Sequence, residues 1–235
     1  MVSDWIALFL RWGHFVAGVL WIGLLYFFNA VSSKLLNFEQ SNFMGTLDPQ
    51  VKLKVYPNLM PKALWWFRWG AFWTVVFGIL LYGYYFPNHW SGSGTKTVFL
   101  IELAWLAVIY VVNFAAISMT AEDKNKPLHN LLFVLAVGIW IFAVLSPFFM
   151  SADAWLATIT VGGGFGILML LNVWGIIWRI QKKVIQANID MGEGKPAPPD
   201  LAKISKMAAV ASRTNFWLSL PMLFLMAAAS HMPRP

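Results

Sequence analysis

Cysteine is absent from this sequence, and charged residues are scarce. Without Cys the chain can form no disulfide, no thiolate metal site and no covalent c-type haem through a Cys-x-x-Cys-His motif. Only 11% of the 235 residues are charged, whereas 59% are hydrophobic, and a soluble domain usually carries about a quarter charged residues. Such a chain cannot cover its surface with polar groups in water, so we expect an integral membrane protein in contact with the lipid bilayer.

The sequence also lacks the signatures of several functional classes. It contains no Gly-rich phosphate loop, no Ser-His-Asp spacing and no His-Glu-x-x-His helix. The formal net charge of +7 does not indicate a nucleic-acid partner, because the basic residues lie in a few loops and form no basic helix with interleaved aromatic residues. Few ionisable residues fall inside apolar stretches, which disfavours a proton-driven transporter or a channel.

Long apolar stretches recur along the chain. A helix needs about 20 mostly apolar residues to cross the hydrocarbon core of a bilayer. Six stretches meet this condition, at residues 12–31, 67–86, 97–116, 130–149, 154–177 and 214–230. The sequence therefore predicts an all-α membrane protein, with residues 1–235 forming one domain, a bundle of about six transmembrane helices.

Basic residues are distributed unevenly among the segments that connect these spans. Fourteen of the seventeen Lys and Arg residues belong to the first, third and fifth connections, if Arg68 at the entry of the second span is counted with the first. Because positive charge is retained on the cytoplasmic side, we expect these connections inside and both termini outside. The fifth connection, about residues 182–210, predicts an extended turn followed by a basic amphipathic helix on the inner leaflet.

Three of the four histidines lie near the predicted outer ends of spans. His14 is two residues inside the first span, His231 is at the end of the sixth, and His89 follows the second. Imidazole is a good iron ligand and helix bundles commonly hold haem, so His14 and His231 are candidate axial ligands of a haem b. The alternative is that each ring has only a structural hydrogen-bond partner, which is the interpretation we favour for His89 and His129.

Two further ionisable residues lie at the same predicted level. Arg11 is a candidate partner for a haem propionate, because a guanidinium matches a carboxylate bidentately. Glu102, five residues into the third span, is interpreted first as a structural partner of Arg11, with proton acceptance as the alternative. The Trp-rich segment 65–69 is explained by an aromatic belt at the membrane interface. These residues identify no catalytic group.

Four stretches together resemble one protein family. They are RWGHFVAGVLWIG at 11–23, PKALWWFRWGA at 61–71, NVW at 172–174 with QKKV at 181–184, and SRTNFWLSLPMLF at 212–224. In order and spacing they are similar to the membrane domain of bacterial urate hydroxylase (the PuuD family), the urate oxidase N-terminal domain. The resemblance extends over about residues 5 to 231.

The resemblance implies a membrane-bound redox protein of the bacterial inner membrane. Family members join this domain to a C-terminal c-type cytochrome and oxidise urate to 5-hydroxyisourate, with electrons leaving through that cytochrome. This sequence ends at Pro235 without Cys for a c-type haem, and it has Gly70 where related sequences often carry Glu.

Two functions follow from the residues and the resemblance together. The first is a haem b protein, with or without urate hydroxylase-like activity, that passes electrons to a separate periplasmic cytochrome c. The second is a non-catalytic membrane subunit of a larger respiratory or photosynthetic electron-transfer complex.

Overall fold

The computed structural model describes residues 2–32, 43–90, 94–121 and 154–229, together with positions 131, 134, 135, 138 and 231. The elements of this described part are all helices, which confirms the predicted all-α class. In chain order they are α1 (Val2–Tyr26), η1 (Phe27–Val31), α2 (Phe43–Thr46), α3 (Pro49–His89), α4 (Thr95–Ala121), α6 (Ala154–Asn172), η2 (Val173–Ile177), α7 (Trp178–Gly192) and α8 (Leu201–Ala229). The segments η1 and η2 are π-helical turns that continue α1 and α6 without a break.

Four helical stretches in the described part are long and apolar enough to cross a membrane. They are Asp4–Val31, Pro49–His89, Leu100–Thr120 and Ala154–Gly192. The predicted fourth span, 130–149, falls almost entirely outside the described residues, and the predicted sixth span lies in α8, which is not one of these four. The structure therefore supports a membrane protein, while the number of six spans stays a prediction.

Several helices are longer than their predicted spans. The 41 residues of α3 are roughly 60 Å long at about 1.5 Å per residue, twice the hydrocarbon thickness of about 30 Å. Its start is fixed by Asp48, whose Oδ1 accepts a 2.8 Å hydrogen bond from the Gln50 amide, and by Pro49 in the first helical turn. Hydropathy locates only the most apolar part of such a helix. The predicted span therefore began at residue 67 and missed residues 49–66 of α3.

The fifth connection is also shorter than predicted, because the helices on both sides of it extend beyond the predicted spans. The helix of the fifth span continues through η2 and α7 to Gly192, and a turn at residues 193–200 leads into α8. Gly194 has a φ of 86°, a left-handed conformation that glycine adopts without strain. Since α8 is one unbroken helix from Leu201 to Ala229, its basic beginning is collinear with the apolar part and is not a separate surface helix.

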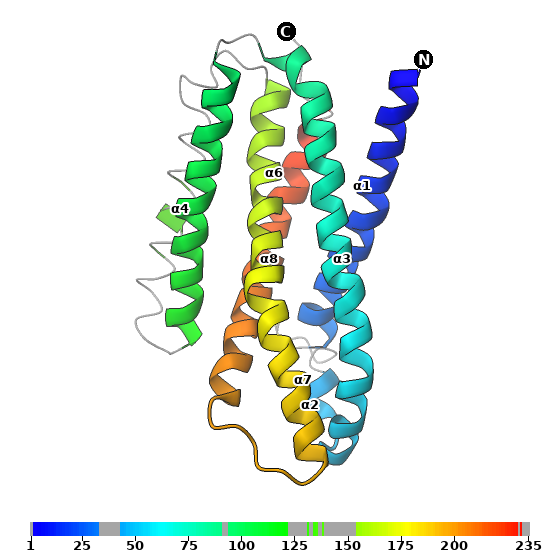
Figure 1. The fold of residues 1–235 in the computed structure, drawn as a ribbon, viewed down its shortest axis with the longest axis vertical. Helices are drawn as coiled ribbons and strands as arrows, with labels where there is room; N and C mark the ends of the chain where they lie inside the picture. The colour runs from blue at the N-terminus through cyan, green and yellow to red at the C-terminus, as the bar shows by residue number, and fades with distance from the viewer. Residues whose placement is uncertain are drawn as a thin grey trace.

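The helices form a bundle in which α1 packs on α3 and α6 packs on α8 (Figure 1). The beginnings of α1, α4 and α6 lie at one end of the bundle, and the turn between α7 and α8 lies at the other end (Figure 1). The first and fifth connections therefore share one end, as the charge pattern predicted. Which end faces the cytoplasm remains a prediction.

Close packing between helices depends on small residues. A Cβ at Gly70 would lie 3.2 Å from the backbone nitrogen of Trp21, so α1 and α3 touch backbone to backbone there. A Cβ at Gly162 would lie 3.1 Å from the Cβ of Leu225, which brings α6 equally close to α8. Small residues at such crossings are how helices associate in lipid, where apolar burial alone gives little. A Glu at residue 70 would not fit between α1 and α3 as they pack here.

Candidate functional site

His14 is held against α3 by one hydrogen bond and one close contact. Its Nδ1 lies 2.8 Å from the backbone oxygen of Thr74, and a Cβ at Gly78 would lie 3.2 Å from its Cε1. A carbonyl oxygen can only accept, so Nδ1 carries the hydrogen, and in a neutral ring Nε2 then carries the lone pair. This is the arrangement found in metal-binding histidines, whose second nitrogen is anchored by a hydrogen bond.

His231 follows the end of α8 and has the same type of anchor. Its Nδ1 lies 3.0 Å from the backbone oxygen of Ala227, and its backbone amide donates to Ala228 at 2.8 Å. The ring is exposed. By the same reasoning as for His14, Nδ1 is the donor and Nε2 carries the lone pair.

The two histidines lie at a similar level in the bundle. The hydroxyls of Tyr26 and Ser219 meet at 3.1 Å and fix the height of α1 against α8. His14 precedes Tyr26 by twelve residues and His231 follows Ser219 by twelve, so at about 1.5 Å per residue each lies roughly 18 Å from this contact, toward the same end. Their rings have different neighbours, however, and the structure does not bring the two rings into contact.

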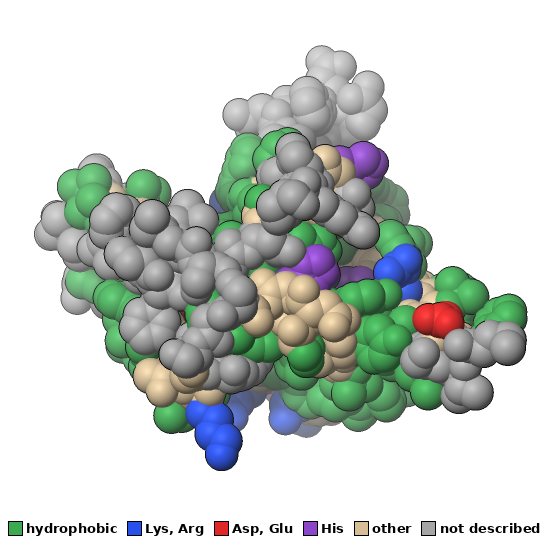
Figure 2. All heavy atoms as spheres, turned by 90° about the horizontal axis from the view of Figure 1, so that it is seen from above, with side chains coloured by type: hydrophobic (Ala, Val, Ile, Leu, Met, Phe, Trp, Pro, Cys, Tyr) green, Lys and Arg blue, Asp and Glu red, His purple; other side chains and the backbone are tan. Residues whose placement is uncertain are grey.

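Figure 2 looks onto that end of the bundle. His side chains are visible there, with hydrophobic side chains and a Lys or Arg side chain close by (Figure 2). His89 stacks on Trp155, with ring centroids 4.2 Å apart and an interplanar angle of 25°, and so joins the end of α3 to the start of α6. His129 lies outside the described residues.

Arg11 pairs with a tyrosine and not with Glu102. Its Nη2 donates a 2.9 Å hydrogen bond to the hydroxyl of Tyr85 on α3, and its Cζ lies 5.8 Å from the Tyr85 ring centroid. Glu102 is buried in α4, with 8% of its surface exposed, and interacts electrostatically with Tyr82. Arg11 and Glu102 therefore do not form the expected pair, and each instead interacts with a tyrosine of α3.

A chain of three buried asparagines, which the sequence reasoning missed, crosses the bundle. Asn113 Nδ2 donates to Asn172 Oδ1 at 2.6 Å, Asn172 Nδ2 donates to Asn215 Oδ1 at 2.8 Å, and Asn215 Nδ2 donates to the Met169 carbonyl at 2.9 Å. The last acceptor is a backbone oxygen, so it fixes the orientation of all three amides. The available signal was one Asn within each of three apolar stretches.

The described residues offer single imidazoles as possible metal ligands. Within the described ranges, no three His, Cys, Asp or Glu side chains come close enough to hold a metal ion. Haem iron requires only axial ligands from the protein, and both candidate imidazoles have Nε2 in the acceptor form. Arg11 lies one helical turn before His14, on the same face of α1.

Comparison with known proteins identifies a family. The family model described as Urate oxidase N-terminal matches residues 1–234, which is almost the whole chain. No curated protein and no solved structure matches the chain. The family match confirms the resemblance seen in the sequence motifs around His14, Gly70, Asn172 and Asn215. The chain therefore belongs to the urate oxidase N-terminal family.

Proposed function

We propose that this chain is a membrane redox protein that binds haem b through His14 and His231 and passes electrons to a periplasmic cytochrome c. The observation that carries the proposal is that both imidazole rings have the same tautomer and the same type of hydrogen bond. Each commits Nδ1 to a backbone carbonyl, and each has Nε2 in the form that binds iron. Their similar level, about twelve residues from the Tyr26–Ser219 contact, supports the same assignment.

The residues of the chain have distinct roles in this proposal. The Thr74 carbonyl orients the His14 ring and increases its basicity as a ligand. Tyr85 holds the Arg11 guanidinium at the same end of the bundle, where it can pair with a propionate. When bound, haem b supplies a one-electron iron couple whose potential depends on its axial ligands. The family suggests urate as the electron donor.

The haem content of the purified protein tests the proposal. A pyridine haemochrome spectrum should show haem b, and His14→Ala and His231→Ala should each remove or strongly shift the Soret band. His89→Ala is the matched control, because His89 stacks on Trp155 and is not assigned to iron. Absence of haem b, or an unchanged spectrum in His14→Ala, would contradict the proposal.

The redox partner and the substrate need a separate measurement. Addition of urate should reduce the haem in the purified protein, and added cytochrome c should then reoxidise it. If haem is present but urate does not reduce it, the protein is a redox protein for another donor. If the protein is isolated only with other subunits and is inactive alone, it is a subunit of a larger complex.

A further inference from the structure

The Arg68 guanidinium in α3 is surrounded by indole rings. Its Cζ lies 3.8 Å from the ring centroid of Trp178, 5.3 Å from that of Trp174 and 5.8 Å from that of Trp69. Its Nε is buried without a hydrogen-bond partner, and in the part of the chain that the structure describes no carboxylate pairs with it. A guanidinium has five N–H donors, and removing it from water is costly unless an anion or acceptor compensates.

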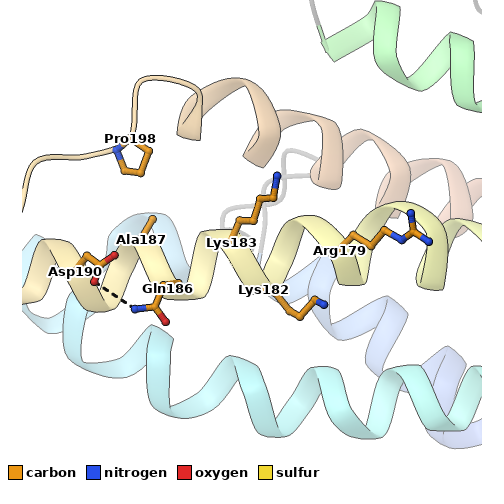
Figure 3. A pocket seen from close by; sticks show the side chains of 7 residues that line it. All are labelled: Arg179, Lys182, Lys183, Gln186, Ala187, Asp190 and Pro198. Atoms are coloured by element: carbon orange, nitrogen blue, oxygen red, sulfur yellow. Dashed lines mark hydrogen bonds between the residues drawn. The ribbon is translucent and has the colours of Figure 1, made fainter.

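A second cation shares the same indole. The Nζ of Lys182 lies 5.5 Å from the ring centroid of Trp178, and its side chain extends toward α3, the helix that carries Arg68 (Figure 3). Two like charges held against one indole repel each other, most strongly where the dielectric constant is low. The indole N–H of Trp174 is also buried without a partner. Three groups that favour an anion, from α3, η2 and α7, therefore lie around the Arg68–Trp178 contact.

Lys182 also lines a cavity of about 590 Å³ along α7, whose lining does not include Arg68. It is lined by Arg179, Lys182, Lys183, Gln186, Ala187, Asp190 and Pro198. Figure 3 shows Lys182 extending toward α3 and Lys183 extending toward α8. The acidic residue of this lining does not neutralise these lysines, because Asp190 is bound by Gln186 at 3.2 Å and by Lys195 at 3.0 Å.

The level of these cations in the bundle indicates the type of anion. Ile176 and Ile177 are both buried at the end of η2, whereas in the basic helix α7, which begins at Trp178, only Val184 and Ala187 are buried. Trp65 and Trp66 on α3, one turn before Arg68 and Trp69, are 47% and 54% exposed. Exposed Trp residues and a change from apolar to basic sequence mark the headgroup region of a bilayer, so the nearest abundant anion is a lipid phosphate.

We propose that Arg68 and Lys182 bind the phosphate headgroup of an anionic phospholipid at this end of the bundle. Basic pockets between helices on the cytoplasmic side are known to bind such headgroups. The acyl chains would then lie along the apolar surface of α3 and η2. The site is distant from the histidine end and is independent of the haem proposal.

Lipid retention by the purified protein tests this site. Native mass spectrometry after exchange into detergent with phosphatidylglycerol or phosphatidylcholine should show preferential retention of phosphatidylglycerol. In K182Q, which changes one exposed residue, retention should fall by about tenfold, the factor expected for loss of charge-assisted contacts. R68Q should have the same effect, and circular dichroism would establish that both variants remain folded.

The control keeps the change in net charge constant. K183Q removes one positive charge from the next residue of α7, whose side chain extends toward α8 (Figure 3), and should retain phosphatidylglycerol as the unmodified protein does. An equal loss in K183Q, equal retention of phosphatidylcholine, or unchanged retention in K182Q would each overturn the proposal. Displacement of the lipid by millimolar inorganic phosphate would assign the site to a soluble anion instead.

Discussion

Gly78 and Gly83 on α3 have different surroundings, although the sequence alone does not distinguish them. A Cβ at Gly78 would press on the His14 ring at 3.2 and 3.3 Å from two of its atoms, whereas a Cβ at Gly83 would meet nothing within 4 Å. The absence of a side chain at residue 78 therefore sets how close the His14 ring can lie to α3. It also allows Nδ1 to reach the Thr74 carbonyl.

This difference predicts the effects of two otherwise identical substitutions. Gly78→Leu should displace His14 from the Thr74 carbonyl and reduce haem b content by at least about tenfold, since loss of a ligand's supporting hydrogen bond typically costs 10–100-fold in affinity. Gly83→Leu should leave haem content unchanged. Absorbance at the Soret band per mole of protein measures both, and equal loss in the two variants would indicate a general packing defect.

At the scale of elements, buried amides connect helices that apolar packing alone would leave free to slide. Asn113, Asn172 and Asn215 join α4, α6 and α8 in one directed chain. Asn29, in the π-helical turn η1, donates to the Leu25 carbonyl and to the Ser212 hydroxyl at 2.9 and 2.8 Å, and thereby fixes α1 against α8. In a medium without water, such hydrogen bonds determine the register between helices.

Substitution at the middle of the asparagine chain should be the most costly. Asn172→Leu removes two hydrogen bonds and leaves Asn215 Oδ1 and Asn113 Nδ2 buried without partners. We expect a loss of about 1–3 kcal/mol in the free energy of unfolding, measured by denaturation in mixed micelles. Asn58→Ala removes an exposed bond to its own helix and is the control. An equal loss of unfolding free energy in both variants would show that the three linked asparagines have no special role in stability.

At the scale of the whole molecule, the positions of the connections predict the membrane topology. The end of α3 and the start of α4 lie at the end opposite the turn at residues 193–200 (Figure 1). The basic residues of α7 and α8 lie toward that turn, so the positive-inside rule predicts that the turn faces the cytoplasm and the histidine end the periplasm. The proposed electron transfer to a periplasmic cytochrome c requires this orientation.

The absence of Cys makes this topology easy to measure. Single substitutions Asn88→Cys and Asp200→Cys introduce one thiol at each end, on exposed positions. A membrane-impermeant maleimide should label Asn88→Cys in intact cells and label Asp200→Cys only after permeabilisation. The reverse pattern would place His14 and His231 on the cytoplasmic side, and delivery of electrons to a periplasmic cytochrome would then be ruled out.

Much of the fold follows from composition and periodicity. The scarcity of charge, the apolar stretches and the distribution of Lys and Arg predicted a helical membrane protein with its first and fifth connections at one end. The motifs around His14 and Asn215 predicted the family that the chain matches. Hydropathy could not predict that α3 begins at Pro49 or that α7 extends to Gly192, because polar helix outside the hydrocarbon core has no apolar signal.

The sequence by itself determined that long helices form and that they are apolar enough for a bilayer, because both depend on the order of residues along one helix. Only the tertiary structure decided which groups meet. The Tyr26–Ser219 contact that relates the levels of His14 and His231, the pairing of Arg11 with Tyr85, the asparagine chain and the contact of Arg68 with Trp178 join residues that are far apart in the sequence. Their meeting depends on how helices rotate and cross, which is set by side-chain packing and hydrogen bonds between helices and not by the apolar pattern of any one of them.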